Sequence, residues 1–345
     1  MRNADFVVKV ANPYFSVHCK HKEPPENLRE ATACAVKEKV FPLFYEGCLK
    51  HHFELPDESR FLMEKYRRRR EKQIEAAKLL TDIQEKYGVE LMFFKTFHPF
   101  KYVPDDVDLL LRDENNLNFL IEILKERGFF VHNVGTPEMG MRKLEGGSYV
   151  DLDIHKRLAV GSLEIFDAEN LWRSHAYETF ELEDGYAVRT LSGDYEVVRE
   201  AAYSLLKDFK LSIAGLYLAV NAMKNRDLAT VKKIAAEQNL KVPLQLYLHV
   251  AYRAACQLFG AEAKKTLLYE ENGDVPFPNN VCGNITVPYQ FPIPAIVFSY
   301  LSKAALEVER NKNLGVIGQV IKQPASKGIS VLLDYARELF ENLAV

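Results

Sequence analysis

The stretch "KTFHPFKYVPDDVDLLL", residues 95–111, places three aspartates, Asp105, Asp106 and Asp108, directly before a run of leucines. Sequence that forms a core normally excludes charge, because a buried carboxylate without a partner is costly. Alternate residues of a strand share one face. Asp106 and Asp108 are therefore predicted to point the same way, while the apolar residues between and after them point into the core.

A second acidic strand is predicted in "YVDLDIHKR", which begins at Tyr149. The same alternation puts Asp151, Asp153 and His155 on one face, with apolar residues packed behind them. The two strands together are expected to present their acids on a solvent-facing cleft of one small sheet.

Such a cluster of acids needs a counter-charge. Two carboxylates about 4 Å apart repel each other by roughly 4 kcal/mol at an effective dielectric constant of about 20. A hard divalent ion with oxygen ligands, Mg²⁺ or Mn²⁺, removes this repulsion. Two such ions, bridged by carboxylates, would activate an attacking hydroxyl and stabilise the leaving pyrophosphate of a nucleotide. The pattern therefore predicts a metal site with nucleotide chemistry.

The order of these segments resembles the nucleotidyltransferase superfamily of the DNA polymerase β type. More narrowly, the motifs resemble an uncharacterised bacterial and archaeal nucleotidyltransferase family, whose members carry an "LKG" turn, a "DIDLL" strand and a later "VDLHW" strand. The resemblance covers most of the chain and is strongest over residues 72–157. The segments that carry it are "ELMFFKTF", "PDDVDLLLRD", "LKERGFFV" and "VDLDIHKRL".

The resemblance implies a function and a set of site residues. The implied reaction moves a nucleoside monophosphate from a nucleoside triphosphate such as ATP to an acceptor hydroxyl in tRNA or other RNA, a protein or a small molecule. Asp106 and Asp108 are the implied ligands of both metal ions, and Asp153 is the implied third ligand, with Asp151 as its rival. The implied triphosphate contacts are Lys95, Thr96 and Lys101.

The turn before the first acidic strand departs from the superfamily pattern. Its members have Gly-Gly or Gly-Ser there, which lets backbone N–H groups approach the triphosphate. This chain has Lys95-Thr96, followed by "FHPF". Either side chains replace the backbone contacts, or the site takes a different ligand, or it is inactive. A pseudoenzyme that binds nucleotide or protein, an RNA-binding module and a phosphodiesterase are the alternatives.

The periodicity of the chain predicts an α+β fold that is mostly helical. Three regions are expected: an N-terminal helical segment over 1–88, a nucleotidyltransferase core with a small mixed sheet over 89–195, and a C-terminal helical domain over 196–345. Helices are predicted over 28–50 with a break at Pro42, and over 59–87, 115–128, 295–309 and 329–343, with three more between 213 and 259. Strands are predicted over 89–94, 107–111 and 129–133, with a hairpin over 140–155.

Bulk properties narrow the classes of protein. The chain has 345 residues, a net charge of −3 and five widely spaced cysteines. A global basic field for nucleic acid is absent, so an RNA partner would need a local patch. Unpaired cysteine spacing and the absence of an apolar stretch long enough for a bilayer predict a reduced, cytoplasmic protein without a membrane partner.

Two further patterns have a plain and a functional interpretation. The run "YRRRREK" (66–72) is predicted to be a solvated helix turn, from which one or two arginines would reach the cleft if the helix packs behind the first strand. Cysteines and histidines near the N-terminus suggest zinc but match no common zinc signature, and buried cysteine is the favoured interpretation. They are His18, Cys19, His21, Cys48, His51 and His52.

Overall fold

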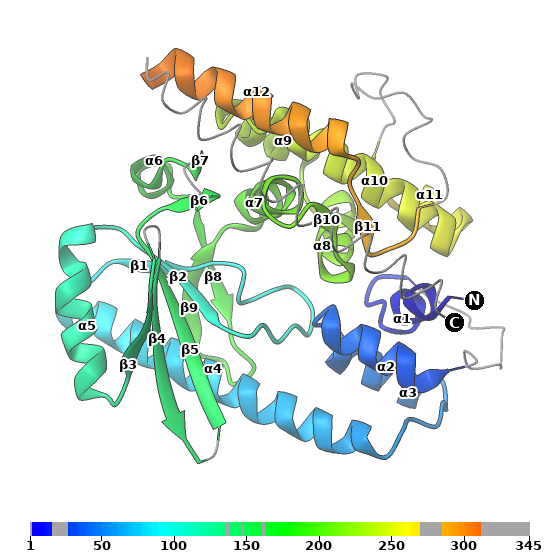
Figure 1. The fold of residues 1–345 in the computed structure, drawn as a ribbon, viewed down its shortest axis with the longest axis horizontal. Helices are drawn as coiled ribbons and strands as arrows, with labels where there is room; N and C mark the ends of the chain where they lie inside the picture. Colours follow the sequence, from blue (N-terminus) through cyan, green and yellow to red (C-terminus); the bar gives the residue numbers. More distant parts are fainter. Residues whose placement is uncertain are drawn as a thin grey trace.

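The computed structural model describes residues 2–15, 27–135, 138–146, 148–160, 163–269 and 285–311. These residues form an α+β fold in which helices predominate, as predicted (Figure 1). The helices are α1 (Asn3–Val10), α2 (Leu28–Lys37), α3 (Phe41–Lys50), α4 (Glu58–Tyr87), α5 (Leu117–Glu126), α6 (Ala168–Arg173), α7 (Gly193–Leu206), α8 (Ile213–Asn225), α9 (Leu228–Glu237), α10 (Lys241–Phe259), α11 (Ala261–Thr266) and α12 (Ile293–Asn311), with a 3₁₀ turn, η1 (Glu114–Asn116), before α5.

The strands form one large sheet and two small ribbons. They are β1 (Leu91–Phe93), β2 (Val107–Leu111), β3 (Phe130–Val134), β4 (Glu138–Glu145), β5 (Ser148–His155), β6 (Leu158–Val160), β7 (Leu163–Phe166), β8 (Tyr177–Glu181), β9 (Ala187–Leu191), β10 (Lys210–Leu211) and β11 (Tyr289–Gln290). The large sheet has seven strands in the order β3-β4-β5-β2-β1-β9-β8. Strands β2 and β5 are parallel neighbours, and Asp108 lies opposite Asp153 in their register.

Most predicted elements are confirmed. Helix α4 ends at Gly88, whose φ of +69° is the left-handed conformation that favours glycine at a helix C-terminus. The predicted 28–50 helix is divided into α2 and α3 at residues 38–40, and Pro42 lies in the first turn of α3. The sheet is larger than predicted, because β8 and β9 join it beside β1. The helix predicted over 329–343 lies outside the described residues.

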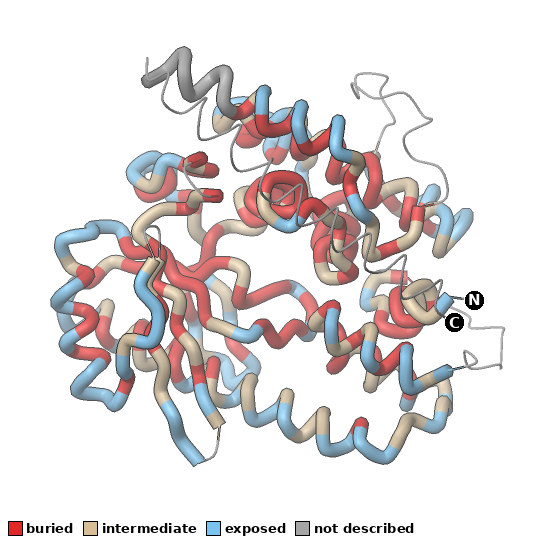
Figure 2. The backbone as a smooth tube through the Cα atoms, in the orientation of Figure 1, coloured by how far each residue is buried: buried red, intermediate tan, exposed pale blue. Residues whose placement is uncertain are grey.

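Two hydrophobic cores lie on opposite faces of the sheet. In β1 and β2 alternate apolar residues go to different cores, so Leu109 packs under α4 and α5 while Leu110 packs with the helices on the other side. Figure 2 shows that the residues in the middle of the sheet are mostly buried. Asp108 shares the face of Leu110 and is 1% exposed. The prediction of a solvent-facing cleft is thus wrong for Asp108, because a second core covers that face.

The predicted N-terminal segment packs in two places. The first half of α4 contributes Leu62, Met63 and Tyr66 to the core on the far side of the sheet, and its second half packs directly on the sheet. Helix α1 packs with the C-terminal helices, where the Tyr217 hydroxyl donates a hydrogen bond to the Val8 carbonyl at 2.9 Å. All seven strands of the large sheet lie within residues 89–195. No helix of the described part is long and apolar enough to cross a bilayer.

The loop between β1 and β2 is built from buried rings. His98 stacks on Phe100 with centroids 5.3 Å apart and an interplanar angle of 14°, and its edge meets Tyr102 at 4.5 Å. Burial lowers the pKa of His98 from its ordinary 6.5 to about 4; the positive charges of Arg199, Arg70 and Lys95 act in the same direction and Glu196 opposes them. The imidazole is therefore neutral at neutral pH.

Because of His98, the protein is expected to lose stability in acid. The pKa of His98 is lower in the folded chain than in the unfolded chain, so the unfolded chain binds more protons between pH 6.5 and 4. The free energy of unfolding should fall as the pH falls through this window, by about 3 kcal/mol at most. His98→Phe should remove this part of the pH dependence in urea titrations between pH 7 and 4. An unchanged pH profile in the variant would contradict the assignment.

Candidate metal centre

Carboxylates from two parallel strands converge on one face of the sheet. Asp108 lies on β2, Asp106 lies directly before this strand, and Asp153 lies on β5 directly opposite Asp108. Ligand atoms of Asp108, Asp153 and His155 all lie within 4.8 Å of one another. The Asp106 carboxylate is not in this group, but its charge raises the pKa of Asp153. Asp108 and Asp153 of the predicted triad therefore form one group with His155, and Asp106 lies beside it.

The cluster carries unfavourable like charges. Burial, followed by the charges of Asp106, Asp108 and Glu138, raises the pKa of Asp153 to about 7. Burial and the Asp108 charge also raise the pKa of Asp106. Burial alone would raise the pKa of Asp108 as well, but Lys95 and His155 outweigh it and hold that pKa well below its usual range. One carboxylate is thus fully ionised, while the two others resist ionisation.

A divalent cation fits this donor set. Oδ1 of Asp106 is buried and has no hydrogen-bond partner among the described residues. Carboxylate oxygens are the ligands of Mg²⁺ and Mn²⁺. His155 adds an imidazole nitrogen, and its Nε2 lies 3.2 Å from Oδ1 of Asp108. An imidazole ligand suits Mn²⁺ better than Mg²⁺. The Nδ1 atom of His155 faces Glu138 at 3.7 Å, which orients the ring.

Lys95 lies over this cluster in a strained turn. Its Nζ is 3.2 Å from Oδ1 and 3.1 Å from Oδ2 of Asp108, and its φ is +61°. A non-glycine residue in this conformation costs about 1–2 kcal/mol. Two contacts hold it there: the ion pair with Asp108, and a hydrogen bond of 3.1 Å from the Lys95 N–H to Oε1 of Glu196. The Thr96 N–H donates to the Phe94 carbonyl at 2.6 Å.

Thr96 supports the acidic strand from inside the protein. The residue is fully buried, and its hydroxyl accepts a hydrogen bond from the Asp108 N–H at 2.9 Å and donates one to the Phe94 carbonyl at 3.2 Å. The side chain therefore fixes the position of Asp108. The contact between Thr96 and a triphosphate stays a prediction, and the single proton of this hydroxyl is already donated to the Phe94 carbonyl.

Thr96→Val should destabilise the fold without changing its shape. Valine has the volume of threonine but leaves the buried Asp108 N–H without its partner, which costs about 1–3 kcal/mol. Urea unfolding measures this loss. Thr81→Val on α4, where the hydroxyl only caps the Ala77 carbonyl of the same helix, is the matched control and should cost no more than about 0.5 kcal/mol. Equal losses in both variants would contradict the role of Thr96.

Two other predicted site residues have different partners. Asp151 receives two hydrogen bonds from Arg142 on β4, at 2.6 and 2.7 Å. Asp151 lies two residues before Asp153 on the same face of β5, and its carboxylate is already bound by Arg142. The geometry therefore favours Asp153 as third ligand. Lys101 is paired with Glu46 at 2.5 Å, and its side chain is 64% exposed. It does not line the cavity beside Lys95, and its part in phosphate binding stays a prediction.

Cations from distant parts of the sequence surround the centre. A cavity of about 250 Å³ beside Lys95 is also lined by Lys37, Lys39 and Lys210. A second cavity of about 300 Å³ shares Lys37 and Lys39 and adds Lys65 and Arg69. Lys39 pairs with Asp105 at 2.8 Å, next to the acidic pair. Sequence reasoning missed these lysines, because nothing local marks residues before 50 or after 205 as neighbours of the acids.

The arginine run divides as predicted. Arg67 and Arg68 pair with Glu64 on the exposed side of α4. Arg69 reaches Asp105 at 2.7 Å and Arg70 reaches Glu183 at 2.8 Å, both with largely buried side chains. Two arginines thus stand beside the loop that carries the acids.

A buried ion-pair network lies under the turn. Arg199 of α7 is fully buried; its Nε donates to Glu196 at 3.0 Å, and its Nη2 donates to Glu196 at 2.7 Å and to Glu200 at 2.9 Å. Glu196 also accepts the Lys95 N–H, so the network fixes the turn. Sequence reasoning missed it, because charges spaced three residues apart on a helix usually form a solvated face.

The zinc interpretation finds no support in the described part. The group of potential ligands found there is Asp108, Asp153 and His155, and Cys48, His51 and His52 form no such group. Cys48 is fully buried in the core, as the plain interpretation expects. His18, Cys19 and His21 lie outside the described residues.

A scan against models of known protein families gives no match to this chain, and a search of curated proteins gives none either. The functional argument therefore depends on the geometry of the site.

Proposed function

We propose that this chain is a metal-dependent nucleotidyltransferase with a core of the DNA polymerase β type. The observation that carries the proposal is the convergence of Asp108 and Asp153 from parallel strands on one face, together with His155, with Asp106 directly before that strand and with a cavity lined by lysines and acids beside Lys95. In the reaction the acceptor hydroxyl attacks the α-phosphorus of a nucleoside triphosphate. The new bond joins the acceptor oxygen to the nucleoside monophosphate, pyrophosphate leaves, and the hydroxyl proton is released.

The three aspartates would hold the divalent ions. Bound there, Mg²⁺ or Mn²⁺ would polarise the α-phosphate and stabilise the leaving pyrophosphate. The protein's own contribution is position and charge. Asp108 is held by Thr96 and Lys95. The β- and γ-phosphates would enter the 250 Å³ cavity, where the lysines Lys37, Lys39, Lys95 and Lys210 outnumber the acids Glu38, Glu200 and Asp208.

A labelling experiment tests the reaction. The protein is incubated with each α-³²P-labelled nucleoside triphosphate, Mn²⁺, and either total cellular RNA, protein lysate or a small-molecule extract. We expect a labelled acceptor in one arm and equimolar pyrophosphate. The Asp153→Asn protein is the matched control and should give neither. Release of nucleoside monophosphate without a labelled acceptor would indicate a phosphodiesterase instead.

A second candidate function is nucleotide binding without turnover. It is favoured by the turn, where both backbone N–H groups are already used: that of Lys95 by Glu196 and that of Thr96 by Phe94. In addition, the Lys95 ammonium occupies both oxygens of Asp108. A protein of this class would bind nucleotide and release no pyrophosphate with any acceptor. An RNA-binding module would instead show a salt-dependent mobility shift that does not need nucleotide.

Lys95→Met should reveal whether the ammonium competes with a metal ion. The variant no longer has a positive charge that competes with the metal ion for Asp108, so Mn²⁺ should bind about tenfold more tightly. This change is equivalent to ~1.4 kcal/mol. Calorimetry without nucleotide measures it. Lys125→Met, in a surface pair with Glu122, is the control and should leave Mn²⁺ affinity unchanged. Weaker Mn²⁺ binding in Lys95→Met would show that the lysine supports the metal centre and does not block it.

A further inference from the structure

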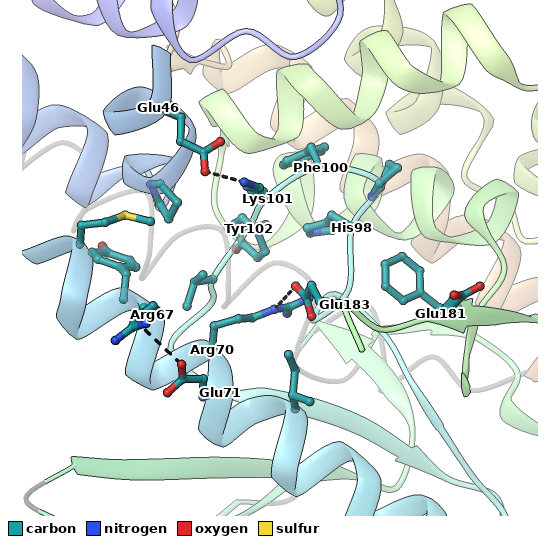
Figure 3. A pocket seen from close by; sticks show the side chains of 17 residues that line it. Glu46, Arg67, Arg70, Glu71, His98, Phe100, Lys101, Tyr102, Glu181 and Glu183 are labelled. Carbon is teal, nitrogen blue, oxygen red and sulfur yellow. Dashed lines mark hydrogen bonds and ion pairs between the residues drawn. The ribbon is translucent and has the colours of Figure 1, made fainter. Parts of the chain in front are cut away.

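A separate cavity lies away from the acids. It has a volume of about 570 Å³ and is enclosed by α3, α4, the loop 98–103 and the end of β8 (Figure 3). This volume is within the range of small-molecule sites, about 300–1,000 Å³. Its lining is mostly apolar and includes Pro42, Met63, Ile74, Phe100 and Phe180. The shape and the rings suit a flat apolar ligand.

The cationic side chains around this cavity are all paired with carboxylates, while Glu181 of the lining has no ion pair among the described residues. Each lysine or arginine of the lining has a carboxylate partner: Lys101 with Glu46, Arg70 with Glu183, and Arg67 with Glu64 and Glu71. Figure 3 shows such pairs around the cavity. No unpaired lysine or arginine of this lining is offered to a phosphate. In the cavity beside Lys95, Lys39 and Lys210 are also paired, with Asp105 and Glu38, but Lys37 has no ion pair among the described residues. An uncharged ligand is therefore favoured.

Two buried nitrogens in the lining have no hydrogen-bond partner among the described residues. They are Nη1 of Arg70 and Nδ1 of His98. Arg70 uses its Nε for Glu183 and lies over the ring of Phe97 at 5.1 Å. His98 is 9% exposed, and Figure 3 shows both side chains directed toward the same space. Unsatisfied buried polar atoms are rare and costly, so a ligand that pairs with them would be stabilised.

We infer that this cavity binds an uncharged, flat heterocycle of nucleoside size, with its rings against Phe100 and Phe180 and its polar edge toward Arg70 and His98. The edge of a purine or pyrimidine carries both hydrogen-bond acceptors and donors. Such an edge can accept from the guanidinium nitrogen of Arg70 and pair with the neutral imidazole of His98. The inference goes beyond the proposed transfer reaction and does not require it. His98 and Tyr102 also line the cavity beside Lys95, so the two sites share a wall.

Saturation-transfer NMR on the full chain tests this site with adenosine, guanosine, cytidine and uridine as probes. At least one nucleoside should bind. His98→Phe keeps the ring and its stacking but removes the nitrogens, and should weaken binding about tenfold. Ile74→Trp fills the cavity and should abolish binding. Phe119→Trp, at an exposed position on α5, is the control and should bind like the native chain. Thermal unfolding checks that each variant is folded.

Three outcomes would overturn the inference. The first is the absence of a signal from all four nucleosides. The second is a signal that persists unchanged in both His98→Phe and Ile74→Trp. The third is a signal that is lost in Lys95→Met and kept in Ile74→Trp, since the ligand would then occupy the cavity beside the acids. Loss of transfer activity with intact nucleoside binding would affect the proposed function alone.

Discussion

Asp106→Ala is expected to abolish divalent-ion-dependent nucleotide binding. The change removes a carboxylate that shares the cluster with Asp108 and Asp153 and whose Oδ1 has no other partner in the described structure. Loss of a ligand that holds both ions should weaken Mn²⁺-dependent binding of a nucleoside triphosphate by at least about a hundredfold, equivalent to roughly 3 kcal/mol. Calorimetry with and without Mn²⁺ measures this effect.

The matched control is Asp151→Ala. Asp151 lies on the same face of the same sheet but is held by Arg142, so its removal should change nucleotide affinity only a few-fold. This comparison also decides between the two candidates for the third ligand. Unchanged binding in Asp106→Ala, or an equal loss in Asp151→Ala, would remove the assigned metal centre.

Arg199→Met is expected to cause the largest loss of stability. It leaves Glu196 and Glu200 without the cation that lies 2.7 and 2.9 Å from their oxygens in a fully buried site. Breaking a buried pair from one side typically costs about 3–5 kcal/mol, because an uncompensated charge remains. Urea unfolding at neutral pH measures the change. Arg173→Met, in an exposed pair with Glu169, should cost at most about 0.5 kcal/mol.

A triple variant separates lost charge pairing from lost packing. Arg199→Met combined with Glu196→Gln and Glu200→Gln removes all three charges and should recover most of the loss, since neutral replacements of a buried ion network are often tolerated. Glu196→Gln keeps a side-chain oxygen that can accept the Lys95 N–H, so the turn at Lys95 should be retained in the triple variant. A cost below about 1 kcal/mol for Arg199→Met alone would show that water reaches this network.

The elements that the sequence predicts well are those with strong local patterns. The alternation of "VDLLL" predicts β2 with the bounds found, Val107–Leu111. The long periodic run before Gly88 predicts α4 to within a residue at its start. Asp108 and the later Asp153 are predicted to meet, and they lie opposite each other in the register of β2 and β5. Strand alternation, which puts each of them on the shared face, is a property of a short segment.

The parts that were missed depend on distant partners. Strands β8 and β9 are short, and many of their side chains are polar or half-exposed, so their alternation gives only a weak apolar signal. Their place beside β1 depends on a pairing almost 100 residues away, between Phe93 and Thr190. The lysines around the 250 Å³ cavity and the buried Arg199 were missed for the same reason. Only tertiary packing reveals that such charges leave the solvent or approach the acids.

The 30-residue span of α4 limits how this protein can be divided. A fragment that starts after Gly88 would expose the apolar underside of the sheet that Ala77, Leu80 and Ile83 cover. A fragment that keeps α4 but omits the preceding helices would instead expose Leu62 and Tyr66. Neither truncation yields a self-contained catalytic module. Limited proteolysis should therefore produce no stable sheet fragment, and the described body should melt in one cooperative step.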